Sequence, residues 1–134
     1  MRLEFVHPNH IASIWPSVEG YLAGAMAHSA GEYNLDQLKA MLATGTQTLL
    51  VLVGDNGIVG AATVATENYP NACIAFVTAI GGREIAKPEH FAQLADWLKA
   101  HGYTAIRGAA FEAVARLWRR FNAKEIYRVV EIPL

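Results

Sequence analysis

Two adjacent glycines followed by an arginine, Gly81-Gly82-Arg83, are the residues best placed for ligand chemistry. They follow an apolar run typical of a strand and precede a helical pattern, so backbone N–H groups are expected to be exposed at the strand end. Such groups can donate hydrogen bonds to a ligand. A plain turn from strand to helix explains the same three residues without a ligand, and both interpretations stay open.

Acid–base chemistry has one candidate, Glu67, near the end of another predicted strand. A carboxylate there can deprotonate an acceptor amine if its pKa is raised toward neutrality. The alternative is a solvated glutamate at a strand end. His28 and Glu32 flank a turn between two predicted helices, where they either contact a substrate or lie on the surface.

The remaining chemically versatile side chains predict no site. Cys73 is the single cysteine, so it forms no internal disulfide, and no activating partner is evident in the sequence. No Cys/His cluster has the spacing of metal ligands. His7 and His10 are expected in a turn or on the surface. His101 precedes the helix-ending Gly102, where a positive charge is favoured by the helix dipole.

Hydrophobic periodicity predicts an α/β domain that positions these residues. Helices are expected over residues 11–28, 34–45, 88–102 and 111–122, and strands over residues 1–6, 46–53, 58–67, 73–80, 103–109 and 123–134. The order β-α-α-β-β-β-α-β-α-β indicates a mixed sheet.

Local signals fix several of these elements. Asp55-Asn56-Gly57 predicts a hairpin, and Tyr69-Pro70-Asn71 predicts the next turn, so the three middle strands form an antiparallel meander. Asn34 and Gln37 have the spacing of a capping box. The continuously apolar run Leu49–Val53 predicts a strand covered on both faces. Pro16 is compatible only with the first turn of its helix.

Composition limits the classes of protein to which the chain can belong. The 134 residues are 53% apolar and 17% charged, which excludes disorder and predicts one domain over residues 1–134. Without a signal sequence or an apolar run long enough to span a bilayer, the chain is expected to be soluble and cytoplasmic, with no membrane partner.

Charge is unevenly distributed. Residues 1–80 hold two basic and six acidic residues, and residues 81–134 hold nine basic and six acidic, so the halves carry −4 and +3. This excess is too weak for nucleic-acid binding. It suits one small polyanionic ligand or an acidic partner. The alternative, which the charge alone favours, is a set of ordinary solvated helix faces.

The second half also carries a family resemblance, which extends over the whole chain. The helix FAQLADWLKAHG, the following YTAIRG and the end RLWRRFNAKEIYRVVEIPL resemble the GNAT superfamily of N-acetyltransferases. The resemblance implies a mixed, mostly antiparallel sheet flanked by about four helices. It also implies acetyl-CoA between the fourth and fifth strands, with its pyrophosphate on the loop before the long helix. The cofactor-binding residues would be Ile80, Gly81, Gly82, Arg83 and Lys87.

Several positions depart from the family pattern. Two small residues expected in the phosphate loop are replaced by Ile85 and Lys87, and glycine matters there because a Cβ keeps the backbone away from phosphate. Trp118 stands where the family often has a tyrosine acid, and Phe111 where it often has an asparagine. Asn122-Ala123 replaces a Gly-Phe pair, and Asn tolerates the same left-handed conformation.

A narrower resemblance points to uncharacterised GNAT-like proteins encoded by bacteriophages. It rests on the combination of IWP, GEYNLDQL, a strand ending in a Tyr-Pro turn, and Gly-Gly-Arg after the next strand. A phage protein would act in the cytoplasm of its bacterial host.

Two functions follow from these resemblances. The first is an acetyltransferase with a degenerate phosphate loop, which transfers acetyl from acetyl-CoA to an amine of a small molecule or protein, with Glu67 as base. The second is a catalytically inactive GNAT-like binding or assembly module. In either case the apolar final strand is expected to pair with a neighbouring copy, giving a homodimer.

Overall fold

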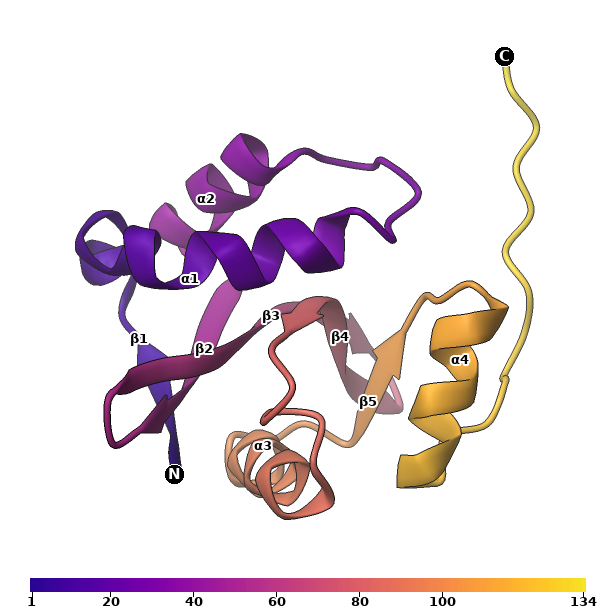
Figure 1. Cartoon of the computed structure of the whole chain (residues 1–134). Helices are drawn as coiled ribbons and strands as arrows, with labels where there is room; N and C mark the ends of the chain where they lie inside the picture. Colours follow the sequence, from indigo (N-terminus) through magenta and orange to yellow (C-terminus); the bar gives the residue numbers. More distant parts are fainter.

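The computed structural model shows one mixed sheet with helices on both faces (Figure 1). It describes residues 1–134, apart from the side chains of Glu112 and Ala113. The strands are β1 (Arg2–Val6), β2 (Thr48–Gly54), β3 (Gly57–Tyr69), β4 (Ala72–Gly81) and β5 (Ala105–Gly108). The helices are α1 (Ile11–Met26), α2 (Leu35–Ala43), α3 (Pro88–Ala100) and α4 (Glu112–Trp118), with short 3₁₀ helices η1 (Pro8–His10) and η2 (Arg119–Phe121).

The strand order is β1-β2-β3-β4-β5. The first four strands pair antiparallel, and β5 pairs parallel to β4. The tight turns after β2 and β3 produce the expected meander, and the α/β class with a mixed sheet is confirmed. Helices α1 and α2 cover one face, α3 covers the other, and α4 lies beside β5 (Figure 1).

Strand β2 is buried on both faces, as its apolar run predicts. Leu49 and Val51 pack with the α1 and α2 side chains, whereas Leu50 packs with α3 on the other face. Each of these residues is at most 1% exposed. Asn34 and Gln37 form the predicted capping box, with both hydrogen bonds at 2.8 Å. Asn122 adopts the left-handed conformation at φ 64°.

Pro16 departs from expectation, because it lies in the second turn of α1 rather than the first. A proline there removes one backbone hydrogen bond of the helix. The flanking Trp15 and Val18 are buried in the core, and their packing holds α1 together despite that loss.

The largest departure is at the C-terminal end. Residues 123–134 form no strand, so the predicted closing strand is wrong for this structure. The segment extends from η2 along the outer side of α4 (Figure 1). Its apolar alternation makes pairing favourable, but a strand also needs a partner edge, which the periodicity cannot supply.

Candidate functional site

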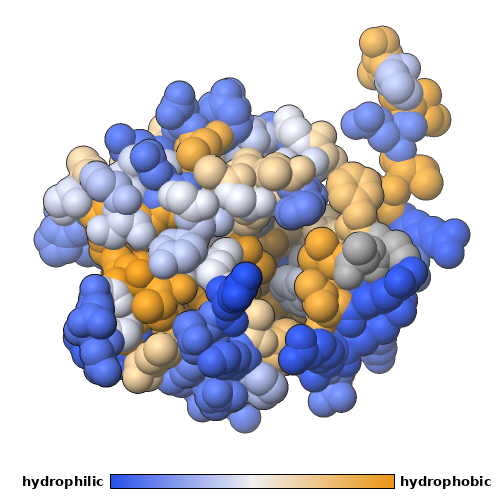
Figure 2. Space-filling model, in the orientation of Figure 1, coloured by the Kyte–Doolittle hydropathy of each residue, from blue (hydrophilic) through white to orange (hydrophobic). Residues whose placement is uncertain are grey.

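The sheet opens between β4 and β5. Parallel pairing joins only residues 74–77 of β4 to residues 105–108 of β5. Beyond Val77, β4 continues to Gly81 and pairs with β3 alone. The outward backbone groups of residues 78–81 therefore have no strand partner, and an extended molecule carrying amides can hydrogen-bond to them as an added strand would. Figure 2 shows the molecule hollowed near the centre of this face.

A β-bulge marks the point where the opening begins. Thr63 pairs with Ala79 and Val64 with Val77, so Thr78 has no residue opposite it. A bulge bends its strand and increases the local twist, which directs β4 away from β5.

Partly buried hydrogen bonds hold this bulge. The Thr78 hydroxyl donates to Gln47 Oε1 at 2.5 Å and lies 2.7 Å from the Thr63 hydroxyl. Thr63 is fully buried and Gln47 is 5% exposed. Sequence reasoning missed these residues, since two threonines in apolar strands and a glutamine before a strand carry no sign of their contact.

The two glycines at the end of β4 are required by packing within the chain. A Cβ on Gly81 would overlap the backbone carbonyl of Tyr21 in α1. A Cβ on Gly82, whose φ is +101°, would lie 2.5 Å from the carbonyl oxygen of Val59. Close approach of α1 and β3 thus accounts for both glycines without a ligand.

The turn after them contributes side chains to the core. Ile85 is fully buried and packs with Leu52 and Ala62. The Ile80 side chain packs against the same cluster. Only the backbone of Ile80 therefore faces the opening, where it could contact a ligand. An apolar anchor thus occupies one of the two positions where the family resemblance implies a small residue.

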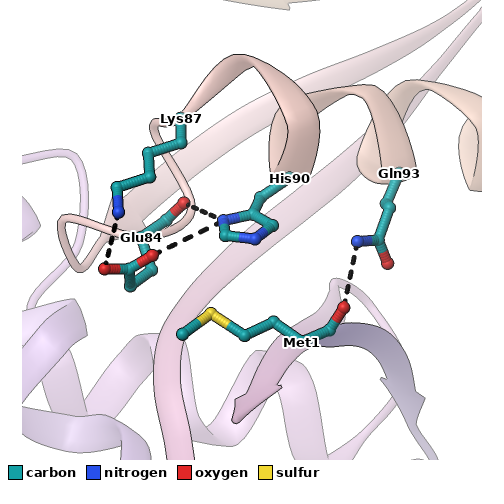
Figure 3. Close-up of polar contacts among 5 residues, drawn as sticks. All are labelled: Met1, Glu84, Lys87, His90 and Gln93. Atoms are coloured by element: carbon teal, nitrogen blue, oxygen red, sulfur yellow. Dashed lines mark hydrogen bonds and ion pairs between the residues drawn. The ribbon is translucent and has the colours of Figure 1, made fainter.

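The charges of this turn are partly paired. Glu84 binds Lys87 Nζ at 3.0 Å, and its backbone oxygen lies 2.6 Å from His90 Nδ1 (Figure 3). The second Glu84 carboxylate oxygen lies 3.7 Å from the same ring nitrogen. Lys87 is therefore neutralised in place, and the exposed Arg83 is the cation of the turn best able to meet an anionic ligand.

Trp118 packs at the inner end of the opening. A Cβ on Gly108, the last residue of β5, would lie 2.9 Å from the Trp118 ring. The same ring meets Phe91 edge to face at 6.4 Å, and Phe91 stacks on Phe121 at 4.1 Å. These rings fix α4 and η2 against α3. An indole offers no acid proton in the position of the family's tyrosine.

Glu67 belongs to a polar cluster at the other end of β3. Its Oε2 accepts a hydrogen bond from the Tyr69 hydroxyl at 2.9 Å, and the Arg107 guanidinium lies 5.9 Å from the Tyr69 ring centre. The hydrogen bond to the Glu67 carboxylate, reinforced by its negative charge, raises the pKa of Tyr69 above its ordinary value. Tyr69 therefore stays protonated and keeps donating to Glu67. Sequence reasoning missed Tyr69 and Arg107 because they come from separate strands.

The structure separates Glu67 from the glycine turn. Glu67 pairs with Ile74, whereas Gly81 pairs with Ala61, so about 20 Å of strand lies between the two pairs. The inner end of the opening, at Val77, is only about 10 Å along the strand from Glu67. The exposed β4 edge thus has the turn that carries Arg83 at one end, and the Glu67 carboxylate lies beyond its other end.

The other residues singled out from the sequence lie outside this arrangement. His28 and Glu32 are exposed on the connection between α1 and α2. The Cys73 backbone N–H donates to the Thr104 hydroxyl at 3.0 Å. His7 Nδ1 accepts from the Asn9 N–H in η1, and His101 stacks on Trp97 at 3.8 Å at the end of α3.

The described residues offer neither a metal site nor a membrane-spanning helix. Among the described residues, no group of three or more His, Cys, Asp and Glu side chains is arranged to hold a metal ion. Of the helices in the described part of the chain, none has the length and apolar character needed to cross a bilayer.

Comparison with known proteins finds similarity in structure alone. No family model and no curated protein matches the chain. A probable acetyltransferase superposes with a TM-score of 0.70 at 12% identity, over 100% of this chain and 98% of its own. A ribosomal-protein-alanine N-acetyltransferase from Brucella melitensis biovar Abortus 2308 gives 0.70 at 13% identity, over 98% and 97%.

A predicted acetyltransferase from Clostridium acetobutylicum, solved with acetyl-CoA, gives a TM-score of 0.66 at 12% identity, over 98% of this chain and 95% of its own. These identities are too low to transfer an activity or a substrate, but the superpositions cover nearly every element. The chain therefore has the fold of the GNAT acetyltransferases.

Proposed function

We propose that the protein is an N-acetyltransferase that transfers the acetyl group of acetyl-CoA to an amine. The observation that carries the proposal is the opening between β4 and β5, where residues 78–81 expose one edge of β4. The similarity to a structure solved with acetyl-CoA supports the same ligand.

The residues around the opening fit the parts of this cofactor. The amides of a pantetheine arm have the spacing of an extended chain and can pair with the free edge of residues 78–81. The exposed Arg83, in the turn after β4, would bind phosphate oxygens at the outer end. When bound, acetyl-CoA supplies a thioester, whose C–S bond breaks as the amine nitrogen forms its bond to the acetyl carbon.

Residues of the chain itself accept the proton that the amine loses. Glu67 accepts the proton that the amine loses, directly or through water, and the Tyr69 hydroxyl orients its carboxylate. Arg107, whose guanidinium lies 5.9 Å from the Tyr69 ring centre, adds a positive charge beside this pair. Because Trp118 has no acid proton to give, the departing thiolate takes its proton from solvent.

A second function is favoured by the turn after β4. The backbone of Tyr21 and Val59 fills the space beside both glycines. Ile85 is buried in the core, and Lys87 is paired with Glu84. These features support the interpretation of this turn as a degenerate phosphate loop. They support a GNAT-like module that has kept the sheet and binds a partner without catalysis, in phage assembly or host takeover.

Calorimetric titration with acetyl-CoA distinguishes the two functions. The acetyltransferase is expected to bind, and Arg83→Glu is expected to weaken binding about tenfold at low salt, because it places a negative charge beside phosphate. Arg2→Glu on the distant strand β1 is the matched control and should leave affinity unchanged. No binding heat at millimolar acetyl-CoA contradicts the acetyltransferase and favours the binding module.

A rate measurement follows where binding is found. Glu67→Gln should lower thiol release with a panel of amines by about 100-fold or more while leaving acetyl-CoA affinity unchanged. An unchanged rate in this variant would remove Glu67 from the mechanism.

A further inference from the structure

Arg107 in β5 is a half-buried cation without an anionic partner. Its guanidinium lies 5.9 Å from the centre of the Tyr69 ring, and among the described residues no carboxylate forms an ion pair with it. Burial removes water from a cation, and a carboxylate on a ligand would replace the lost interactions. This arginine is therefore a candidate to bind an anionic group that the chain itself does not supply.

Arg107 lies on the same face of the sheet as Glu67 and Tyr69. Ile106 packs in the cluster that includes α3, so its neighbour Arg107 lies on the opposite face, on the side of α1. In β3, Val64 packs in the same α3 cluster. Glu67 and Tyr69, three and five residues further on, therefore also lie on the α1 side. The unpaired cation and the proposed base thus share one surface.

Glu67 and Arg107 flank strand β4 on this surface. Glu67 of β3 pairs with Ile74, and Arg107 of β5 pairs with Phe76, two residues further along β4. Two strand spacings and two residues separate their Cα atoms, which is a distance of about 12 Å. Because both side chains extend several ångströms from the backbone, one small molecule can contact both.

Phe76 supplies an apolar surface between the two charges. Its neighbours Ala75 and Val77 pack with α3, so the Phe76 side chain lies on the α1 side, with Glu67 and Arg107. The ring is half-buried, which leaves part of it open to a ligand. Val77 is also the residue where the opening between β4 and β5 begins, so this surface adjoins the inner end of that opening.

Three such groups match the three parts of an amino acid, namely its amine, its side chain and its carboxylate. We propose that the acceptor of the acetyl group is a free amino acid, whose amine lies at Glu67 and whose carboxylate binds Arg107. This inference rests on the proposed acetyl transfer and names the class of acceptor. The side chain of the amino acid lies on Phe76, which favours an apolar one.

The carboxylate takes no part in the bonds that change. The amine nitrogen bonds to the acetyl carbon as the C–S bond of the thioester breaks, and Glu67 accepts the proton of the amine. The departing thiolate takes a proton from solvent. Arg107 holds the acceptor in place throughout, so it determines specificity rather than the chemical step.

The chemistry of a single guanidinium favours a carboxylate over other anions. Its planar N–H groups match the two oxygens of a carboxylate, and one arginine balances one negative charge, whereas a phosphate monoester carries nearly two. A protein N-terminus has an amide in place of this carboxylate. The unpaired Arg107 therefore favours a free amino acid over a protein as the acceptor.

N-acetylphenylalanine, which has the carboxylate and an apolar side chain of the expected product, tests the site in the full chain without acetyl-CoA. The matched probe is N-acetylphenylalanine amide, which lacks the negative charge. In titrations followed by amide chemical shifts, wild type should bind the acid about tenfold or more tightly than the amide. Arg107→Gln should bring this ratio close to one. Arg107→Lys keeps the charge without the planar fork and should keep part of the preference.

Arg2→Gln is the matched control for net charge. It removes one positive charge from β1, at the opposite edge of the sheet from β5, and should leave the preference for the acid unchanged. Arg107 lies outside the buried core, so its variants should stay folded.

Reaction rates separate this inference from the proposed function. With acetyl-CoA, phenylalanine should be acetylated with a kcat/KM about tenfold or more above that of phenylalanine amide, and the difference should lie in KM. Arg107→Gln should remove the difference between the two amines. Glu67→Gln should instead lower kcat for both.

Several outcomes overturn the inference. Equal affinity for the acid and the amide, or a preference that survives Arg107→Gln, shows that Arg107 does not bind the carboxylate. A preference lost equally in Arg2→Gln reports net charge alone. Equal acetylation of both amines overturns the amino-acid acceptor and leaves the acetyltransferase standing. Binding of the acid through Arg107 without binding of acetyl-CoA contradicts the acetyl transfer instead and leaves Arg107 as a carboxylate site.

Discussion

At the scale of single residues, the proposed acetyl transfer depends most on the hydrogen-bonded pair of Tyr69 and Glu67. A carboxylate that holds a hydrogen bond from a phenol is oriented, and the phenol in turn is stabilised in its neutral form. Arg107 opposes that effect by favouring the phenolate, but the hydrogen bond and charge of Glu67 outweigh it, so the pKa of Tyr69 is raised.

The raised pKa predicts a specific titration. The Tyr69 phenolate, obtained as the absorbance difference between wild type and Tyr69→Phe, should appear above pH 10, the ordinary value of tyrosine. In a Glu67→Gln background the pKa should return toward 10, because the two largest raising causes, the hydrogen bond to the Glu67 carboxylate and its negative charge, are removed. Tyr69 in the folded state keeps its proton longer than in the unfolded state. Its stabilising contribution is therefore complete below pH 10 and declines as the pH rises through the raised pKa.

A Tyr69 that titrates at the ordinary value, with no response to Glu67→Gln, would contradict the hydrogen bond. The pair would then be no support for Glu67 as a base.

Single residues also show which local features the sequence predicts. The capping box of Asn34 and the left-handed Asn122 follow from side-chain chemistry within a few residues of each position. The burial of Ile85 does not, since it depends on Leu52 and Ala62, which are distant in the sequence. The same holds for the contact of Thr78 with Gln47.

At the scale of elements, the close packing of α1 on the end of β4 shapes the outer end of the opening. The Tyr21 carbonyl lies directly against Gly81, and the Tyr21 hydroxyl donates to the Ile58 carbonyl at 3.2 Å. Helix and strand can approach so closely only because β4 ends in residues without a Cβ. The glycines thereby set where β4 lies relative to α1 and β3.

A pair of glycine variants tests that packing. Gly81→Ala forces α1 away from β4 and should lower the free energy of unfolding by about 1–3 kcal/mol. Gly20→Ala in α1 is the control: a Cβ there meets nothing within 4 Å, so alanine should raise stability by about 0.5–1 kcal/mol. Urea unfolding measures both.

Stability unchanged by Gly81→Ala would contradict the packing account. The glycine would then be better explained by a ligand that needs close access to the backbone.

Element order followed from the sequence because each helix and strand carries its own periodicity and end signals. The meander, the burial of β2 on both faces and the position of α3 all rest on such local patterns. The last segment shows the limit. Apolar and polar side chains alternate in residues 123–134 as they do in a strand. Pairing also needs a free strand edge, and α4 stands between this segment and the edge at β5.

At the scale of the whole molecule, the β4–β5 opening and the two ends that flank it form one arrangement. The Thr78 bulge directs β4 away from β5, Trp118 and Gly108 bound the inner end, and Arg83 stands beyond the outer end. The +3 charge of residues 81–134 begins at this turn, although Glu84 neutralises Lys87 there. The chain thus has an exposed strand edge with a cation at its end, and an extended ligand can bind along it.

Backbone amide chemical shifts recorded during an acetyl-CoA titration show whether acetyl-CoA binds along the exposed edge of β4. We expect saturable shifts in residues 78–81, in Arg83 and in Gly108, with no change at the β2–β3 hairpin around Asn56. Absence of shifts at millimolar acetyl-CoA, or shifts confined to residues away from the β4–β5 opening, would contradict it.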